Sequence, residues 1–232
     1  MLQKTGLSQR AVLSMSRHLK RFVRHRQCRN YGICVGVQNT LFRPPFTSES
    51  VILDVGCADD ADFSVMLMSR FNARCFGVDP TRKHLPALRR LEESSDGKFV
   101  AVPFAVCARS GELEFFESEQ NVSGSLQRDH GNVLRDSVRS YTVTAVTIDK
   151  LLDHLGLTHA DMLKLDLEGA EYELLSAVDA DTLHRFQQMF VEFHHHCVER
   201  YSASDTRSLV ARIETMGFTS FSFDDHNYLF FR

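Results

Sequence analysis

Short apolar strands alternate with amphipathic helices from residue 51 onward, and this alternation constrains the fold more than any other feature of the sequence. The run Val51–Val55 ends at Gly56 and has the length and β-branching of a buried strand. Residues 62–71 place apolar side chains on one side of a predicted helix. Further strands are predicted over residues 75–79, 99–102, 113–116, 141–147, 162–167 and 190–193, and further helices over residues 82–93, 149–155, 170–178 and 204–215. Strands that alternate with helices in this way imply a mostly parallel sheet covered by helices on both faces.

The end of the sequence predicts a β-hairpin. Residues 218–223 and 228–231 are apolar runs on either side of the polar stretch 224–227. Because the strands of a hairpin are antiparallel, this hairpin adds an antiparallel strand to the sheet. The expected fold class is therefore α/β, with a doubly wound, mostly parallel sheet. The polar loop over residues 118–137 is expected to cover the ligand-binding end.

The N-terminal segment differs in charge from the rest of the chain. Residues 1–50 hold nine Lys or Arg and one acid, and residues 7–26 show helical period with an apolar stripe: Leu7, Ala11, Met15, Leu19, Phe22 and Val23. Three interpretations stay open: a helix whose stripe packs on the domain, an Arg-rich organelle presequence, or an arm that binds an anionic lipid or phosphate surface. Arg43-Pro44-Pro45 breaks the pattern, so we expect an arm and linker over residues 1–46 and a main domain over residues 47–232.

The remaining residues carry 18 basic and 29 acidic side chains, so DNA is not an expected partner. No stretch approaches the ~20 apolar residues of a membrane-spanning helix. The six cysteines form no C-x-x-C pair, and residues 1–30 lack the compact apolar stretch of a secretory signal. A cytoplasmic location is expected, or a mitochondrial or other organellar one if residues 1–30 are a presequence.

Ligands of such sheets bind beyond the carboxyl ends of the strands, so the residues there were the first candidates for a site. The first strand ends in Gly56, followed by Cys57 and then by a group of acids: Asp59, Asp60 and Asp62. Carboxylates at this point repel a pyrophosphate and argue against a dinucleotide. They suit a cofactor that has a positive centre and no phosphate, such as S-adenosylmethionine.

Asp79 ends the second strand, where an acid can hold the hydroxyls of a ribose. The alternative is a capping role before Thr81. A third candidate group is Lys164, Asp166 and Glu168, which alternate onto one face of a predicted central strand. Buried charges need partners, so this group is either a structural ion pair or the mouth of the site.

Glu192, His194 and His196 alternate in the same way on the next strand. Three histidines and a cysteine in a row suggest zinc, but adjacent residues of one strand cannot form a tetrahedral site, so no metal is expected. A histidine at a strand end beside an acid is a better candidate for a general base.

These segments resemble the FkbM-type S-adenosylmethionine-dependent methyltransferases. The resemblance rests on the stretches 52–56, 76–80, 105–106, 111–115, 146–152, 163–171 and 191–194. The most specific of them contains Lys164-Leu165-Asp166-Leu167-Glu168-Gly169-Ala170-Glu171. It covers residues 51–232. It implies a Rossmann-like class I methyltransferase fold with a seven-stranded sheet, and transfer of a methyl group to an oxygen of a sugar or another hydroxylated small molecule.

The resemblance also implies roles for individual residues. Asp54 and Gly56 would shape the methionine end of the cofactor pocket, with Cys57 beside them, while Asp79 would bind the ribose and Ala105 the adenine. Asp166, Glu168 and His194 would border the acceptor. For direct displacement, His194 and Asp166 are the two candidate bases, and His194 is expected to titrate closest to neutral pH.

One departure supports a different function. The family usually has a second glycine in the first loop, where this sequence has Asp60 or Ala61. Loss of that glycine removes backbone freedom. A non-catalytic binding protein with a degenerate cofactor loop is therefore one alternative, and a methyltransferase that acts on RNA through the basic arm is another.

Overall fold

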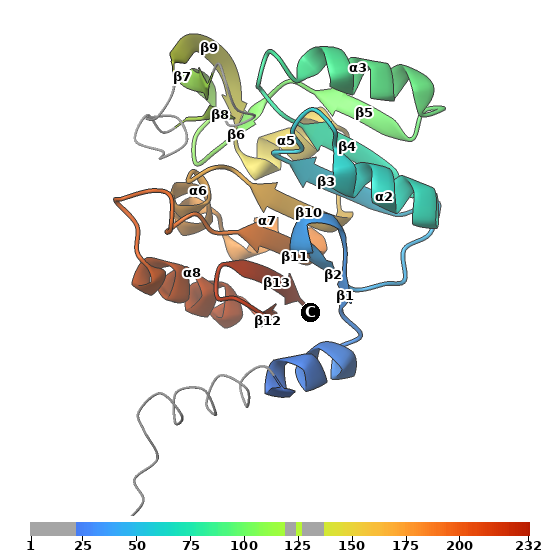
Figure 1. Ribbon diagram of the computed structural model, residues 1–232, viewed down its shortest axis with the longest axis vertical. Helices are drawn as coiled ribbons and strands as arrows, with labels where there is room; N and C mark the ends of the chain where they lie inside the picture. The colour runs from blue at the N-terminus through green and yellow to red at the C-terminus, as the bar shows by residue number, and fades with distance from the viewer. Residues whose placement is uncertain (1–21, 119–123, 127–136) are drawn as a thin grey trace, which may run out of the picture.

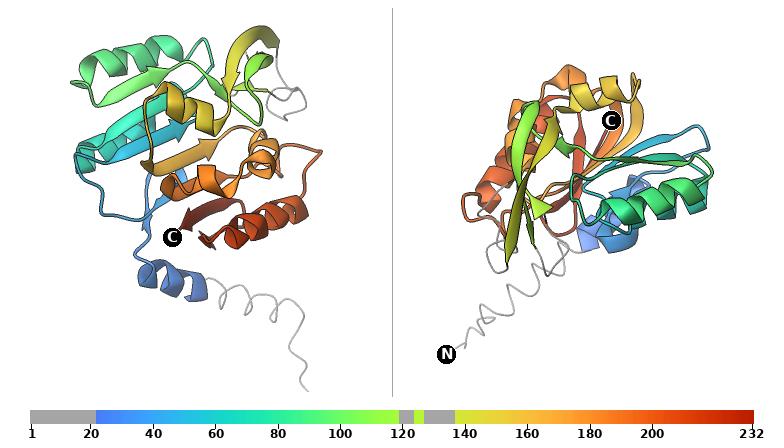
Figure 2. Two further views of the ribbon diagram at one scale, coloured as in Figure 1. Left: turned by 180° about the vertical axis from the view of Figure 1, so that it is seen from behind. Right: turned by 90° about the horizontal axis from the view of Figure 1, so that it is seen from above.

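The computed structural model describes residues 22–118, 124–126 and 137–232. These residues form a central sheet with helices on both faces and a smaller second sheet beside it (Figures 1 and 2). Most of the predicted N-terminal helix and much of the predicted loop over residues 118–137 lie outside the described residues.

Seven strands form the central sheet in the order β12–β13–β11–β10–β3–β4–β5. Their bounds are β3 (Val51–Val55), β4 (Arg74–Val78), β5 (Phe99–Val102), β10 (Ala160–Asp166), β11 (Phe186–Glu192), β12 (Thr219–Ser222) and β13 (Asn227–Phe231). The pairs are parallel except for the two that β13 makes. The predicted α/β fold, with a mostly parallel sheet and an antiparallel C-terminal hairpin, is confirmed.

Successive residues of a strand point to opposite faces of the sheet. Each face therefore has its own apolar side chains, on which a layer of helices packs. Ile52 and Met162 belong to the core cluster on one face, and Leu53 and Leu163 to the cluster on the other. The first cluster includes residues of α2 (Asp62–Phe71) and α3 (Leu85–Ser94). The second includes residues of α5 (Ile148–His154), α6 (Glu171–Ala177), α7 (Ala180–Leu183) and α8 (Ala203–Thr215).

A second sheet is a feature that the sequence patterns did not predict. It has the strand order β6–β9–β7–β8, with bounds β6 (Ala105–Val106), β7 (Gly111–Ser118), β8 (Gly124–Ser125) and β9 (Val138–Val146). Two of its strands were predicted as strands, but their pairing with each other depends on tertiary contacts. Figure 1 shows β7, β8 and β9 as a separate layer at the end of the molecule near β5.

The described N-terminal residues form a helix over residues 22–30, followed by the short strands β1 (Cys34–Val35) and β2 (Leu41–Phe42). Leu41, Phe42 and Phe46 are buried in the same core cluster as α2. Residues before the predicted boundary at 46 and 47 therefore contribute to the core of the main domain. The boundary itself stays a prediction.

The apolar stripe predicted for the N-terminal helix is not buried where it can be observed. Phe22 is 63% exposed and Val23 is 45% exposed, so these two side chains do not pack on the domain.

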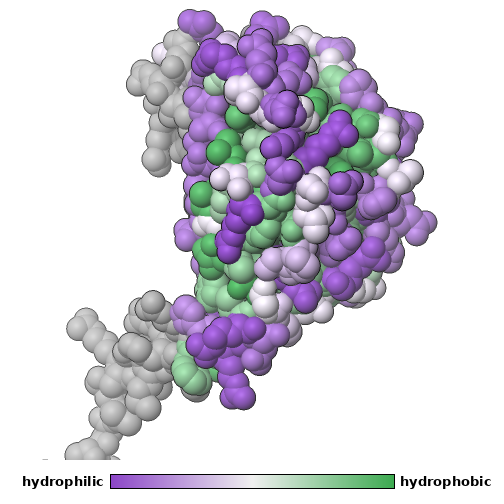
Figure 3. Space-filling view, turned by 90° about the vertical axis from the view of Figure 1, so that its right-hand side faces the viewer, coloured by the Kyte–Doolittle hydropathy of each residue, from purple (hydrophilic) through white to green (hydrophobic). Residues whose placement is uncertain are grey.

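Figure 3 shows hydrophobic residues gathered along the middle of the face above this helix, with hydrophilic residues around them. Among the described helices, none has the length and apolar character needed to cross a membrane.

The first loop gives a test of the fold. Gly56 has φ = +78°, and a Cβ at this position would lie 1.8 Å from the carbonyl oxygen of Asp166. Gly97 is a matched control, because it has φ = +76° and nothing within 4 Å of such a Cβ. We expect Gly97→Ala to lower the free energy of unfolding by about 1 kcal/mol. We expect Gly56→Ala to cost at least ~2 kcal/mol more, because β3 and β10 must separate. Urea unfolding measures both, and equal losses would contradict the expectation.

Candidate functional site

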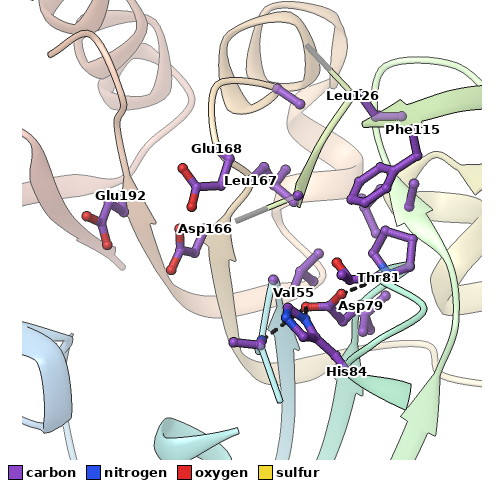
Figure 4. Close-up of a pocket in the computed structure, with 18 of the residues that line it drawn as sticks. Val55, Asp79, Thr81, His84, Phe115, Leu126, Asp166, Leu167, Glu168 and Glu192 are labelled. Atoms are coloured by element: carbon purple, nitrogen blue, oxygen red, sulfur yellow. Dashed lines mark hydrogen bonds and ion pairs between the residues drawn. The ribbon is translucent and has the colours of Figure 1, made fainter. Parts of the chain in front are cut away.

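A cavity of about 370 Å³ lies where β3, β4, β10 and β11 end. Its wall contains most of the predicted site residues: Gly56, Asp79, Ala105, Asp166, Glu168 and His194. Figure 4 shows that Asp79, Thr81 and His84 form one side, whereas Asp166, Glu168 and Glu192 lie on the other. The sheet therefore brings together residues that are far apart in the sequence.

The loop after β3 keeps a tight conformation although the second glycine is missing. Ala58 has φ = +56° and Ala61 has φ = +45°, values that favour glycine. Each alanine in this region costs roughly 1–2 kcal/mol. The surrounding contacts hold the loop in place, including a hydrogen bond from Gly56 N to Val78 O at 2.8 Å. The loop therefore adopts positive φ at two positions that are alanine rather than glycine.

Asp79 lies at the end of β4 and is only 4% exposed. Its carboxylate accepts hydrogen bonds from the backbone N–H groups of Thr81 at 2.8 Å and Ala58 at 3.0 Å, and lies 3.2 Å from Nδ1 of His84. The bond to Thr81 is the local cap that was the alternative interpretation. Asp79 also lines the cavity, so the local bond and a site role coexist.

His84 was not predicted as a site residue. Its ring is 4% exposed and lines the cavity next to Asp79, and its Nε2 atom has no hydrogen-bond partner among the described residues. A buried polar atom without a partner is costly. No signal in the sequence separates His84 from a solvent-exposed residue at the start of a helix.

Lys164 forms the centre of a buried ion network below the cavity. Its ammonium lies 3.2 Å from Asp54 Oδ1, 3.1 Å from the carbonyl oxygen of Gly56 and 3.4 Å from Asp166 Oδ2. Burial alone would lower the pKa of Lys164, but Asp54 and Asp166 raise it above its ordinary value. Ser64 Oγ donates to the other oxygen of Asp54 at 2.8 Å.

Asp54 and Cys57 lie behind the wall of the cavity rather than in it. Asp54 is 1% exposed, and its carboxylate faces Lys164. Cys57 packs in the apolar core, where burial raises the pKa of its thiol. Neither residue lines the cavity, so the roles expected for them at the methionine end of the cofactor pocket stay predictions. Asp54 affects the cavity through Lys164.

His194 follows β11 and is tied to Glu171 at the start of α6. Glu171 Oε1 lies 3.0 Å from His194 Nδ1 and also accepts the backbone N–H of His194 at 2.8 Å. On the other side of the ring, Nε2 lies 3.6 Å from Asp166 Oδ1 and 3.7 Å from Glu168 Oε2. Three carboxylates therefore surround one imidazole.

This surrounding changes the protonation of His194. Burial lowers its pKa, but the hydrogen bond to Glu171 and the charges of Glu171, Asp166 and Glu168 raise it to about 10. The expectation that His194 titrates closest to neutral pH is wrong. An imidazolium ion has no lone pair that can accept a proton. Asp166 is the other candidate base of the two that the sequence suggested.

Glu192 is a second residue that the list of candidate site residues missed. It ends β11, lines the cavity and pairs in register with Asp166 of β10. Burial raises its pKa to about 7, and Asp166 contributes to this shift, while His194 and Lys164 oppose it. The alternation of Glu192 and His194 along the strand was the available signal.

The second sheet supplies the apolar side of the cavity. Ala105, Val106, Phe115 and Leu126 line it. The sheet is held in position by Ser125 Oγ, which donates to the carbonyl oxygen of Glu168 at 2.9 Å. Within the described ranges, no group of three or more His, Cys, Asp or Glu side chains has the geometry of a metal site.

Comparison with known proteins identifies the family. The fold is a mixed α/β fold of the methyltransferase kind. The model of the FkbM methyltransferase domain matches residues 22–221, and the chain belongs to this family, as the sequence motifs predicted. The members of this family use S-adenosylmethionine as their cofactor. Membership of the family therefore confirms the predicted cofactor.

Two solved structures are similar to this chain at low sequence identity, and the first of them shows the same fold. The FkbM methyltransferase from Methylobacillus flagellatus KT is 13% identical, and the similarity covers 82% of this chain and 45% of that one, with a TM-score of 0.52. The fibrillarin pre-rRNA processing protein of Methanococcus jannaschii is 9% identical, with 87% and 70% of the two chains covered and a TM-score of 0.48. The chain thus spans under half of the length of the Methylobacillus protein. The comparison with curated proteins gave no match.

The residues present fit this cofactor. Carboxylates of Asp166 and Glu168 in the wall suit a positively charged sulfur. Ala105, Val106 and Phe115 offer an apolar surface for a purine. On the same side, Asp79 and the unpartnered Nε2 of His84 offer polar atoms for ribose hydroxyls. A pyrophosphate would require Lys or Arg in the wall of the cavity. Among the described residues, no Lys or Arg lines it.

The three consecutive histidines test the electrostatics of the site. His194 is expected to stay protonated up to about pH 10, whereas the pKa values of His195 and His196 are lowered, first by burial and further by the charge of His194. Imidazole nitrogen shifts measured by NMR at pH 8 should show one charged and two neutral rings. A neutral His194 at this pH would contradict the network.

The same shift predicts a dependence of stability on pH. The folded pKa of His194 lies above the value of 6.5 for the unfolded chain. Its stabilising contribution is therefore complete below pH 6.5 and is lost as the pH rises towards 10. Thermal unfolding across this range should show a steeper loss for the wild type than for His194→Gln.

Proposed function

We propose that the chain is an S-adenosylmethionine-dependent methyltransferase that methylates a hydroxyl group of a sugar or another small hydroxylated molecule. The observation that supports this most is the division of one cavity into two sides. Asp79, Ala105 and Phe115 line the cavity and offer a nucleoside surface. Figure 4 shows Asp166 and Glu168 across the cavity from Asp79 and Phe115. Membership of the FkbM family supports the same proposal.

The cofactor, when bound, supplies a methyl group on a positively charged sulfur, which becomes a neutral thioether as the methyl moves to the acceptor oxygen. Asp79 and His84 would hold the ribose, and the wall around Ala105 and Phe115 would hold the adenine. The backbone at Gly56 would border the methionine part. Most of the rate enhancement would come from the position in which these residues hold the two reactants.

Asp166 would take the proton of the acceptor hydroxyl as the new carbon–oxygen bond forms. Burial raises the pKa of its carboxyl, and this outweighs the opposing charges of Lys164 and His194. A raised pKa makes a carboxylate a better base near neutral pH. Lys164 and His194 would hold its two oxygens in place, because they contact one oxygen each.

The two alternatives have less support. A degenerate cofactor loop would favour a non-catalytic binding protein, but Ala58 and Ala61 keep the backbone in the tight conformation of the loop. An RNA substrate would need cations around the cavity. The described wall instead contains six acidic residues and no Lys or Arg.

Cofactor binding is the first test. Calorimetry should show micromolar binding of S-adenosylmethionine to the full chain. Asp79→Asn removes a charged acceptor of hydrogen bonds and should weaken binding about ten-fold or more. Asp96→Asn is a matched control, because Asp96 is exposed and does not line the cavity. If the intact chain does not bind, the proposed function fails, and the non-catalytic alternative gains support.

Proton transfer is tested by Asp166→Asn. The loss of a general base should lower turnover by a factor of ~10²–10⁴ while the affinity for S-adenosylhomocysteine changes little. Release of S-adenosylhomocysteine in the presence of a panel of hydroxylated sugars measures turnover. Asp153→Asn, an exposed carboxylate outside the cavity, serves as the control. Turnover that survives in Asp166→Asn would assign the base elsewhere.

A further inference from the structure

We propose that the acceptor carries a positively charged amine in addition to its hydroxyl group, and that the carboxylate of Glu192 binds this amine. The inference rests on the proposed function, because it concerns the acceptor side of the same cavity. It adds a charge to the expected substrate: an aminated sugar or amino alcohol rather than a neutral or phosphorylated one.

The charge of the cavity wall is the first argument. Six carboxyl groups line it: Asp59, Asp60, Asp79, Asp166, Glu168 and Glu192. Among the described lining residues there is no Lys or Arg. The cations near the acceptor side are Lys164 and His194, and both are already engaged by carboxylates at 3.0–3.7 Å. The wall therefore keeps an excess of negative charge.

The position of Glu192 is the second argument. In the parallel pair β10 and β11, Asp166 and Glu192 are register partners, so two carboxyl groups end neighbouring strands at the same edge. Asp166 has Lys164 and His194 as partners. In the described part of the chain, no residue forms a hydrogen bond or an ion pair with the carboxylate of Glu192. Glu192 therefore offers a carboxyl group that no described residue engages directly.

The protonation of Glu192 agrees with this interpretation. Its pKa is raised to about 7, first by burial and then by the charge of Asp166. At neutral pH only about half of the Glu192 carboxyl groups are thus ionised, because Lys164 and His194 offset only part of the cost of burying the charge. A ligand ammonium beside Glu192 and Asp166 would remove this cost, whereas a phosphate or carboxylate on the ligand would increase it.

Three sugars that differ in charge test the inference. Calorimetry on the protein saturated with S-adenosylhomocysteine compares glucosamine, N-acetylglucosamine and glucose 6-phosphate, whose charges are positive, neutral and negative. Glucosamine should bind about ten-fold more tightly than N-acetylglucosamine, and glucose 6-phosphate should bind most weakly. In Glu192→Gln this preference for glucosamine should disappear.

The control variant is Glu199→Gln. Glu199 is exposed, lies close to Glu192 in the sequence and does not line the cavity, so this variant should keep the preference for glucosamine. Equal affinities of the wild type for the three sugars, including no binding of any, would overturn the inference. A preference that persists in Glu192→Gln would also overturn it. So would a loss of S-adenosylhomocysteine affinity in this variant, because Glu192 would then serve the cofactor.

Failure of this inference and failure of the proposed function can be told apart. Binding of S-adenosylhomocysteine to the wild type is measured first, in the same calorimeter. If this ligand does not bind, the proposed function itself fails. If it binds and the three sugars show no dependence on charge, the methyltransferase proposal stands and only the amine is rejected.

Discussion

A single buried ammonium group, that of Lys164, ties the central strands β3 and β10 to the loop that follows β3. It contacts Asp54 of β3, the carbonyl oxygen of Gly56 in the loop and Asp166 at the end of its own strand. Burying such charges costs several kcal/mol per ion unless they are paired. The pairing therefore fixes both the cofactor loop and the carboxylate at the centre of the cavity, and the rest of the site is arranged around these two.

A second layer of charge follows from the first. Asp166 lies between Lys164 and His194, and His194 is held by Glu171 of α6. The protonation of each member depends on its neighbours, so the charges of Glu171, Asp166 and Glu168 raise the pKa of the His194 imidazole. Glu192 forms no ion pair with a described residue, and its pKa is raised first by burial. The network acts as a unit, because low local polarity strengthens every charge interaction within it. This explains why His194, a candidate base in the sequence, has a pKa raised to about 10 and carries a positive charge at neutral pH.

Much of the fold could be predicted from the sequence, because hydrophobic periodicity is a local property. The helix predicted over residues 62–71 is α2 (Asp62–Phe71), and the strands predicted at Val51 and Phe99 are β3 and β5. Alternation placed Asp166 and Glu168 on one face of one strand and Glu192 and His194 on one face of the next, and all four line the cavity. Short elements such as β1, β2 and α7 were missed, since two to four residues carry too little periodicity to detect.

The sequence by itself thus determined the strand and helix alternation, the family and the acids at the strand ends. The tertiary structure decided how these acids are used. Asp54 is paired with Lys164 and does not line the cavity. Glu171 lies 23 residues from His194 in the sequence, and its contact with the ring raises the pKa of His194. The contacts around the first loop hold Ala58 and Ala61 at positive φ. Charge, hydrogen bonding and burial act through space, so distance along the chain does not reveal which carboxylates are neutralised and which remain for a ligand.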